Sequence, residues 1–184
     1  MARRNGPWTI TDSAEKYRNG FIAVREDRVL QPDGRPGSYA VVTMQPGVAV
    51  LPVDRDGVAY LTRQFRYPLG RESVEAACGA IGGGEAPLDA AQRELREELG
   101  ITAEDWRDLG RMDLDTSTIH GPVQLFLARE LAFTETAREG TETIATVKIP
   151  FADAVRMVLE SAITHGPSCV LLFKAGHALG GRGA

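Results

Sequence analysis

Apolar and polar residues alternate through much of the first third of the chain, the period expected of strands that turn one face toward a core. Turn-forming segments rich in proline, glycine and aspartate, such as "QPDGRPG" and "DRDG", separate these runs. The pattern therefore predicts successive strands, mostly joined as hairpins, at residues 21–30, 38–45, 47–54 and 58–65.

The period changes to that of a helix in "APLDAAQRELREEL", residues 86–99. Four apolar residues fall on one stripe of this segment, a proline suits its first turn, and a glycine directly after it is a stop signal. The stripe consists of Leu88, Ala91, Leu95 and Leu99, the proline is Pro87, and the glycine is Gly100. We expect an amphipathic helix with a narrow apolar face.

Strand character returns at residues 123–133 and 141–150, and two helical patterns follow at 151–162 and 168–179. The elements thus come in the order β-rich, helix, β, helix, helix. This order favours a mixed central sheet flanked by helices, that is, an α+β fold built as an α/β/α sandwich.

Composition narrows the classes of partner. The 184 residues carry a net charge of −4 with both signs mixed along the chain, so no basic face for a nucleic acid polymer or an anionic membrane is expected. Cys78 and Cys169 have no ligand partner at zinc-like spacing. Since no apolar run approaches the ~20 residues that cross a bilayer, we expect a cytoplasmic protein.

Three carboxylates crowd the predicted helix within five residues, at Glu94, Glu97 and Glu98. Because successive residues of a helix are about 100° apart, the three carboxylates occupy an arc of roughly 100°. Like charges this close together destabilise an isolated helix. The crowding therefore predicts that a cation binds next to these carboxylates. Carboxylate oxygens suit Mg²⁺ or Mn²⁺, and Arg93, one turn before Glu97, has the spacing to orient that carboxylate.

Taken alone, "RELREEL" is typical of a solvated helix face, but a fixed frame surrounds it. The frame runs Gly79, five residues, Glu85, seven residues, Arg93-Glu94-Leu95, one residue, Glu97-Glu98, one residue, Gly100. Chance agreement with such a frame in a chain of this length is on the order of one in a million. The segment resembles the Nudix box at every position, which implies a hydrolase acting on a nucleoside diphosphate linked to another moiety.

The resemblance also implies roles for the box residues. Glu94 and Glu98 are the expected metal ligands, Glu97 bridges or supports them with a share in catalysis, and the backbone carbonyl of Cys78 completes the site. The implied cofactor is Mg²⁺, with Mn²⁺ as a substitute. Gly79 lets the backbone approach metal or phosphate because it has no Cβ, while the Cys78 thiol itself is expected to do no chemistry.

Beyond the box, stretches such as "VAYLTRQFRYPLG" and "VEAACGAIGGGE" are similar to the ADP-ribose pyrophosphatase branch of the family. That likeness implies substrate contacts at Arg66, Glu75 and Trp8. It also implies a glutamate on a later loop that takes the proton of the attacking water. The segment "TETAREGTET" offers Glu139 and Glu142, between which the sequence does not choose, and Glu135 less favourably.

Two segments depart from the branch, "DLDTSTIHGP" after the box and "AACG" before it. A GDP-sugar or broad nucleotide-sugar pyrophosphatase is therefore an alternative to an ADP-ribose enzyme. A Nudix-fold nucleotide sensor without catalysis is a second alternative, although sensors often lack box carboxylates that this chain retains. The likeness further implies an N-terminal β arm, residues 1–45, that pairs in a homodimer, and a catalytic domain at residues 46–184.

Overall fold

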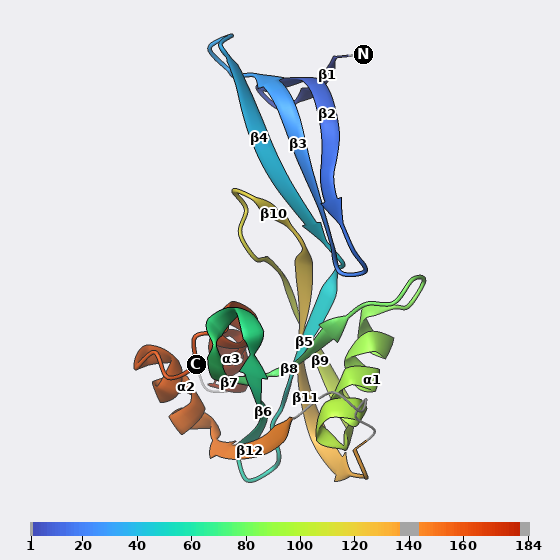
Figure 1. Ribbon diagram of the computed structural model, residues 1–184. Coiled ribbons are helices and arrows are strands. Elements are labelled where there is room, and N and C mark those ends of the chain that lie inside the picture. Colours follow the sequence, from blue (N-terminus) through green and yellow to red (C-terminus); the bar gives the residue numbers. More distant parts are fainter. Residues whose placement is uncertain (1, 137–143, 181–184) are drawn as a thin grey trace. The chain divides into compact units, whose positions relative to one another are not determined.

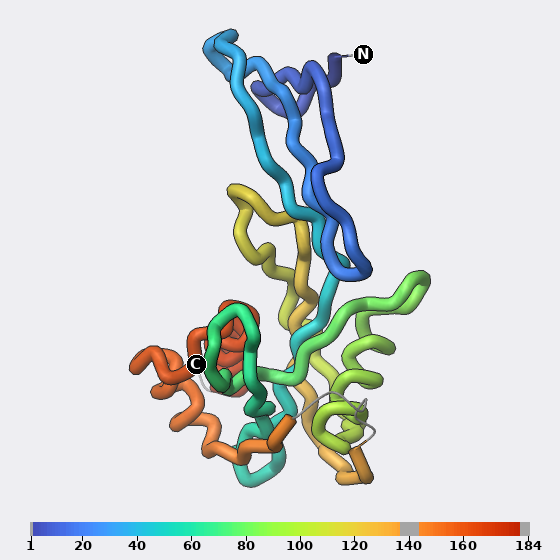
Figure 2. The backbone as a smooth tube through the Cα atoms, in the orientation of Figure 1, coloured from blue at the N-terminus to red at the C-terminus, as the bar shows by residue number. Residues whose placement is uncertain are grey.

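The computed structural model describes residues 2–136 and 144–180. The chain divides into two compact units, each described here by itself. One unit holds the predicted arm, Met1–Gln45, together with the later segment Asp113–Pro122, which the hydrophobic pattern did not assign to it. The other unit holds Pro46–Met112 and Val123–Ala184. Figure 2 lets the reader follow the chain out of and back into the second unit around residues 113–122.

A five-stranded sheet of order β1-β2-β3-β4-β10 forms the first unit (Figure 1). Its strands are β1 (Arg3–Asn5), β2 (Trp8–Arg18), β3 (Ile22–Leu30), β4 (Pro36–Met44) and β10 (Ile119–His120). The long strand β2 was not predicted, because eight of its eleven residues are exposed and the sequence shows little apolar alternation there. Pairing with β3 along most of its length supplies its backbone hydrogen bonds instead.

Two further sheets form the second unit, a four-stranded one of order β8-β5-β11-β9 and a three-stranded one of order β12-β6-β7. The strands are β5 (Gly47–Pro52), β6 (Val58–Arg66), β7 (Arg71–Glu75), β8 (Ala77–Ala80), β9 (Ile101–Asp113), β11 (Pro122–Phe133) and β12 (Ala145–Pro150). The four-stranded sheet is mixed, since β5 runs parallel to β11 and antiparallel to β8. A short 3₁₀ turn, η1 (Tyr67–Leu69), joins β6 to β7.

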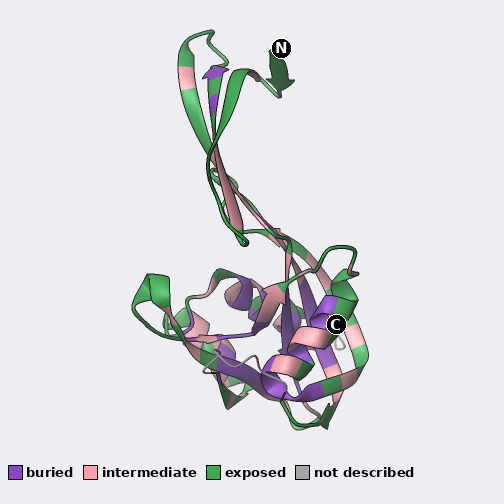
Figure 3. Ribbon diagram, turned by 45° about the vertical axis from the view of Figure 1, so that its right-hand side comes forward, coloured by how far each residue is buried: buried purple, intermediate pink, exposed green. Residues whose placement is uncertain are grey.

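Helices cover the second unit from two sides. The helix α1 (Pro87–Leu99) packs with Val48, Val50 and other residues in one hydrophobic cluster. The helices α2 (Phe151–Leu159) and α3 (Gly166–Gly180) contribute to a second cluster with Leu51, Leu61 and their neighbours. Successive residues of β5 point alternately into the two clusters. The expected α/β/α sandwich is confirmed, and Figure 3 shows its buried residues gathered between the helices.

The predicted helix is α1, and its ends follow the sequence signals. Pro87 occupies the first turn, and Gly100 ends the helix in the left-handed region with φ +63. The predicted stripe is right in its later turns, where Leu95 and Leu99 are buried, but wrong at Leu88, which is 37% exposed. Leu88 lies in the first turn, while Ala90, outside the predicted stripe, is buried.

The strand β9 was also missed, because exposed and half-buried polar residues dominate its sequence. No helix in the described ranges has both the length and the apolar character that crossing a bilayer requires.

Replacement of Gly100 by alanine tests how tightly α1 is terminated. A Cβ there would lie 2.5 Å from the carbonyl oxygen of Thr134 and would hold an alanine at positive φ. The strain and the overlap together should lower the free energy of unfolding by about 2–4 kcal/mol in urea titrations. Gly57→Ala, at φ +77 in open space, isolates the backbone strain and should cost only about 1 kcal/mol. Equal losses in the two variants would show that the contact with Thr134 contributes nothing.

Candidate active site

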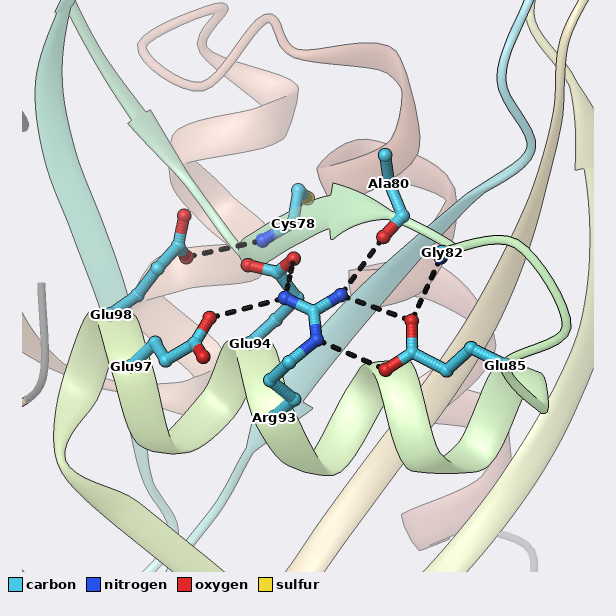
Figure 4. A network of polar contacts seen from close by, with 8 residues as sticks. All are labelled: Cys78, Ala80, Gly82, Glu85, Arg93, Glu94, Glu97 and Glu98. Carbon is cyan, nitrogen blue, oxygen red and sulfur yellow. Dashed lines mark hydrogen bonds and ion pairs between the residues drawn. The ribbon is translucent and has the colours of Figure 1, made fainter. Parts of the chain in front are cut away.

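The predicted metal ligands lie where α1 faces the strand β8 (Figure 4). The backbone N–H of Cys78 donates to Oε2 of Glu98 at 3.2 Å. Glu98 is only 6% exposed, so this bond helps to satisfy a carboxylate that the core would otherwise exclude. One residue further on, an added Cβ at Gly79 would overlap the Glu94 carboxylate. The absence of a Cβ at Gly79 therefore leaves room for the Glu94 carboxylate in the position it occupies here.

A single arginine ties the remaining box carboxylates together. Arg93 Nε donates to Glu85 at 3.0 Å, and Nη1 donates to Glu94 at 2.6 Å and to Glu97 at 3.1 Å. Its Nη2 reaches both Glu85 and the backbone carbonyl of Ala80, at 3.2 and 3.0 Å. The bond to Glu85 raises the pKa of Arg93 far above its usual value, against the opposing effect of burial. Arg93 is therefore a permanent cation among four acceptor groups.

Glu85 has a structural role that the sequence did not assign, although it is one of the box positions. Its Oε2 accepts the backbone N–H of Gly82 at 2.8 Å, which closes the glycine-rich turn before α1. The hydrogen bond from Arg93 lowers the pKa of Glu85, so this carboxylate remains ionised. Glu85 lies in the turn before α1, so helical geometry does not place it next to Arg93, and the only signal for their contact was the box frame.

A second ion pair lies at the ends of β6 and β7. Arg66 Nε donates to Oε1 of Glu75 at 3.0 Å and Nη2 donates to Oε2 at 2.6 Å, a two-pronged contact. Glu75 is 1% exposed. Burial raises the pKa of Glu75, but the hydrogen bonds from Arg66 and Ser73 and the positive charge of Arg66 outweigh it, so the net pKa lies below the usual value. The structure thus brings together two residues that were predicted separately as substrate contacts.

Cys78 lies close to both groups. Burial raises the pKa of its thiol well above the usual value, and the negative charges of Glu98 and Glu75 act in the same direction. The charge of Glu98 also raises the pKa of Arg66, with Glu75 as the largest cause. The thiol is therefore neutral, and the carboxylates of α1 and the Arg66–Glu75 pair share one electrostatic environment.

The donor set fits a hard divalent cation. Glu94, Glu97 and Glu98 offer carboxylate oxygens, and the cradle at Gly79 brings backbone close to them. Across residues 2–136 and 144–180, no three His, Cys, Asp or Glu side chains lie grouped so that together they could hold a metal ion. Mg²⁺ is usually bound by one or two carboxylates, several waters and substrate phosphates, so it does not need three protein ligands.

The other predicted residues are placed as follows. Trp8 lies in the first unit, edge-on to Tyr39 with 5.6 Å between ring centroids, and lines a cavity of about 460 Å³ in that unit. Glu139 and Glu142 lie outside the described residues. Glu135 is described and exposed. His165 and Ser168 at the start of α3 contact this region and were not predicted, since neither belongs to a motif.

Comparisons with known proteins agree with this geometry. Residues 43–165, well over half of the chain, match the NUDIX domain, and residues 8–42 match the nucleoside diphosphate sugar hydrolase N-terminal domain. The chain is 33% identical to an ADP-ribose pyrophosphatase of Bacillus subtilis over 144 residues, covering 77% of this chain and 78% of that protein. It is 32% identical over 160 residues to an ADP-ribose pyrophosphatase of Mycobacterium tuberculosis, covering 84% and 77%.

A crystal structure of an ADP compounds hydrolase has the same fold, with a TM-score of 0.83, 23% identity and 96% of both chains covered. The box residues, their contacts with β8 and the matching domain lead to one conclusion, which confirms the resemblance inferred from the sequence. The chain belongs to the Nudix family of hydrolases.

Proposed function

We propose that the chain is a Mg²⁺-dependent pyrophosphatase that hydrolyses a nucleoside diphosphate sugar, with ADP-ribose the first candidate and AMP and ribose 5-phosphate the products. The observation that carries the proposal is the cluster of α1 carboxylates held against β8 by Arg93. It combines a site for a hard cation with a backbone that a phosphate can approach closely.

The chain's own residues have distinct tasks in this reaction. Glu94 and Glu98 hold the cation with the Cys78 carbonyl, and Glu97 supports them. Arg93 fixes the directions of Glu94 and Glu97 through its two Nη1 bonds. When bound, a divalent cation supplies Lewis acidity and an activated water for attack on phosphorus, and Mn²⁺ can substitute for Mg²⁺. In the hydrolysis, a water oxygen would bond to one phosphorus, the bridging oxygen would leave with the other phosphate, and a carboxylate of the chain would accept the proton of the water.

Arg66 is suited to the substrate diphosphate. Glu75 occupies the Nε and Nη2 side of its guanidinium, and Nη1 has no hydrogen bond to any residue in the described ranges. The free N–H groups can therefore pair with a phosphate while Glu75 holds the planar group in place. Glu75 then acts on the substrate through Arg66.

The choice of nucleotide sugar is supported by the relatives. Two of them are named ADP-ribose pyrophosphatases, and the domain matched by residues 8–42 is described as that of nucleoside diphosphate sugar hydrolases. The altered "DLDTSTIHGP" segment leaves a GDP-sugar or a broader preference as the alternative.

We include in the proposal a homodimer formed through the 1–45 arm. Tyr17 and Phe21, which are 54% and 79% exposed, offer it apolar surface, and Trp8 is kept as a proposed substrate contact.

The metal assignment predicts a separation of activity from stability in Glu98→Gln. The amide oxygen can still accept the Cys78 N–H, whereas the charge needed to hold the cation is lost. Mg²⁺-dependent hydrolysis should fall at least about 10²-fold, and the Tm measured in EDTA should change little. Asp89→Asn, an exposed carboxylate at the other end of α1, should keep its activity. Retention of activity in Glu98→Gln would refute the assignment.

A substrate panel tests the class of linkage. ADP-ribose, ADP-glucose, GDP-mannose, NADH, a diadenosine polyphosphate and nucleoside triphosphates should each be incubated with Mg²⁺ and with EDTA, with product phosphates read by a coupled phosphatase. We expect ADP-ribose to give the highest kcat/KM and EDTA to abolish turnover. Turnover of triphosphates alone would overturn the nucleotide-sugar proposal, and preference for GDP-mannose would select its alternative.

Values of kcat measured at saturating substrate test whether a loop carboxylate accepts the proton of the attacking water. We propose that Glu139 or Glu142 takes the proton of the attacking water, so its change to glutamine should lower kcat by about 10²- to 10⁴-fold with little change in KM. The loss should shrink at alkaline pH, where hydroxide is more available. Glu135→Gln is the matched control and should keep kcat. If all three variants retain kcat, the base lies elsewhere, with Glu97 the first to examine.

A further inference from the structure

His165 makes contacts that the proposed chemistry does not use. It directly precedes α3, and its side chain is 27% exposed. Its Nδ1 lies 2.8 Å from Oγ of Ser168 and 3.5 Å from Oε2 of Glu75. Ser168 is fully buried, and its Oγ already accepts the N–H of Ala76 at 2.8 Å. A single ring nitrogen thus faces two oxygens, one of which belongs to the buried partner of Arg66.

The charge of Glu75 selects the tautomer of this ring. A lone pair on Nδ1 would point toward an ionised carboxylate, whereas a proton on Nδ1 can be donated to Ser168 while it lowers the potential at Glu75. The Nδ1–H form is therefore favoured. Burial lowers the pKa of His165 and the charge of Arg66 acts with it, against the charge of Glu75, so the ring is neutral near neutral pH. Nε2 is left as the basic nitrogen.

His165 affects Arg66 because both side chains lie next to the same oxygen of Glu75. Oε2 of Glu75 accepts Nη2 of Arg66 at 2.6 Å on one side and faces the His165 proton on another. The hydrogen bond from Arg66 and the electrostatic attraction of the His165 N–H, which lies on another side of the same oxygen, together restrict rotation of the carboxylate more than the hydrogen bond alone. A carboxylate restrained in this way holds the plane of the guanidinium, and with it the direction of the free Nη1 group.

We propose that His165 is a positioning residue that, anchored by Ser168, fixes Glu75 and thereby aims the free edge of Arg66 at the substrate diphosphate. This inference rests on the proposed function only in naming the anion that Arg66 receives. His165 lies 90 or more residues from Arg66 and Glu75 in the sequence, and α3 is the element that carries it to them. The start of α3 would thus belong to the substrate-binding machinery and not only to the hydrophobic core.

Steady-state kinetics with ADP-ribose and Mg²⁺ test the proposal. His165→Ala should raise KM about three- to tenfold, the size of one net hydrogen bond, with kcat nearly unchanged. His165→Asn carries an amide N–H close to the position of Nδ1 and should restore KM, whereas His165→Gln, whose amide lies further out, should not. His177 is an exposed histidine within α3, the helix that His165 precedes, so His177→Ala is the matched control and should leave KM unchanged. An unchanged KM in a folded His165→Ala protein would overturn the proposal.

A double-mutant cycle separates positioning from general stabilisation. In an Arg66→Ala background, the further change His165→Ala should leave KM unaltered, because the effect passes through Arg66. Additive increases in KM would show that His165 acts by another route. If His165→Ala fails to fold, the comparison of His165→Asn with His165→Gln in the two backgrounds decides the same question.

NMR provides a readout that needs no turnover. Long-range ¹H–¹⁵N spectra should show the Nδ1–H tautomer of His165, and the Nε–H signal of Arg66 should exchange faster with water in His165→Ala and recover in His165→Asn. An Arg66 signal indifferent to His165 would refute the positioning role even in an active enzyme. Wild-type protein that leaves the whole substrate panel intact would refute the proposed function, while the NMR result would still decide this inference.

Discussion

The charge balance around Arg93 is the constraint on which the rest of the site depends. Three glutamates one turn or less apart repel one another, and a helix that carries them is weakened unless cations stand nearby. Arg93 supplies one cation from within the same helix, and its bonds extend to Glu85 and to the carbonyl of Ala80. The same guanidinium therefore holds α1, the turn before it and β8 in one arrangement.

That arrangement explains why activity and core packing are linked in this unit. The face of α1 that carries the carboxylates also carries small apolar side chains, since Ala90 and Ala91, one turn before Glu94, are fully buried together with the neighbouring Leu95. Small residues allow α1 to lie close to β5 and β8, and the absence of a Cβ at Gly79 leaves space for the Glu94 carboxylate. The packing of the core thus sets the distance between helix and strand, and this distance determines where the carboxylates lie relative to β8.

The second ion pair shows a different principle. Glu75 is almost fully buried and would be costly as a lone charge, yet Arg66 gives it two hydrogen bonds and keeps part of its own surface exposed. The pair thus connects the buried carboxylate of Glu75 to the partly exposed guanidinium of Arg66. Contacts of Ser168 with Ala76 and of His165 with Glu75 attach α3 to the same strand segment, so helices on both sides of the sheet meet the residues 75–78.

The sequence by itself determined the features that depend on local geometry. The fixed rotation per residue of a helix places Glu94, Glu97 and Glu98 on one arc, and proline and glycine mark the two ends of α1. The box frame identified the family for the same reason, since its spacing corresponds to one turn and one helix that carries its carboxylates on one face. Strands with clear alternation, such as β3 and β6, were found within a few residues of their true bounds.

Only the tertiary structure decided the contacts between elements. The polar strands β2 and β9 owe their conformation to neighbours in the sheet, which no local pattern records. Glu85 contacts Arg93, Arg66 contacts Glu75, and His165 contacts Glu75, and in each pair the two residues belong to different elements or turns. Such meetings depend on how sheets twist and where helices dock, because these set the distances between side chains that are remote in the chain.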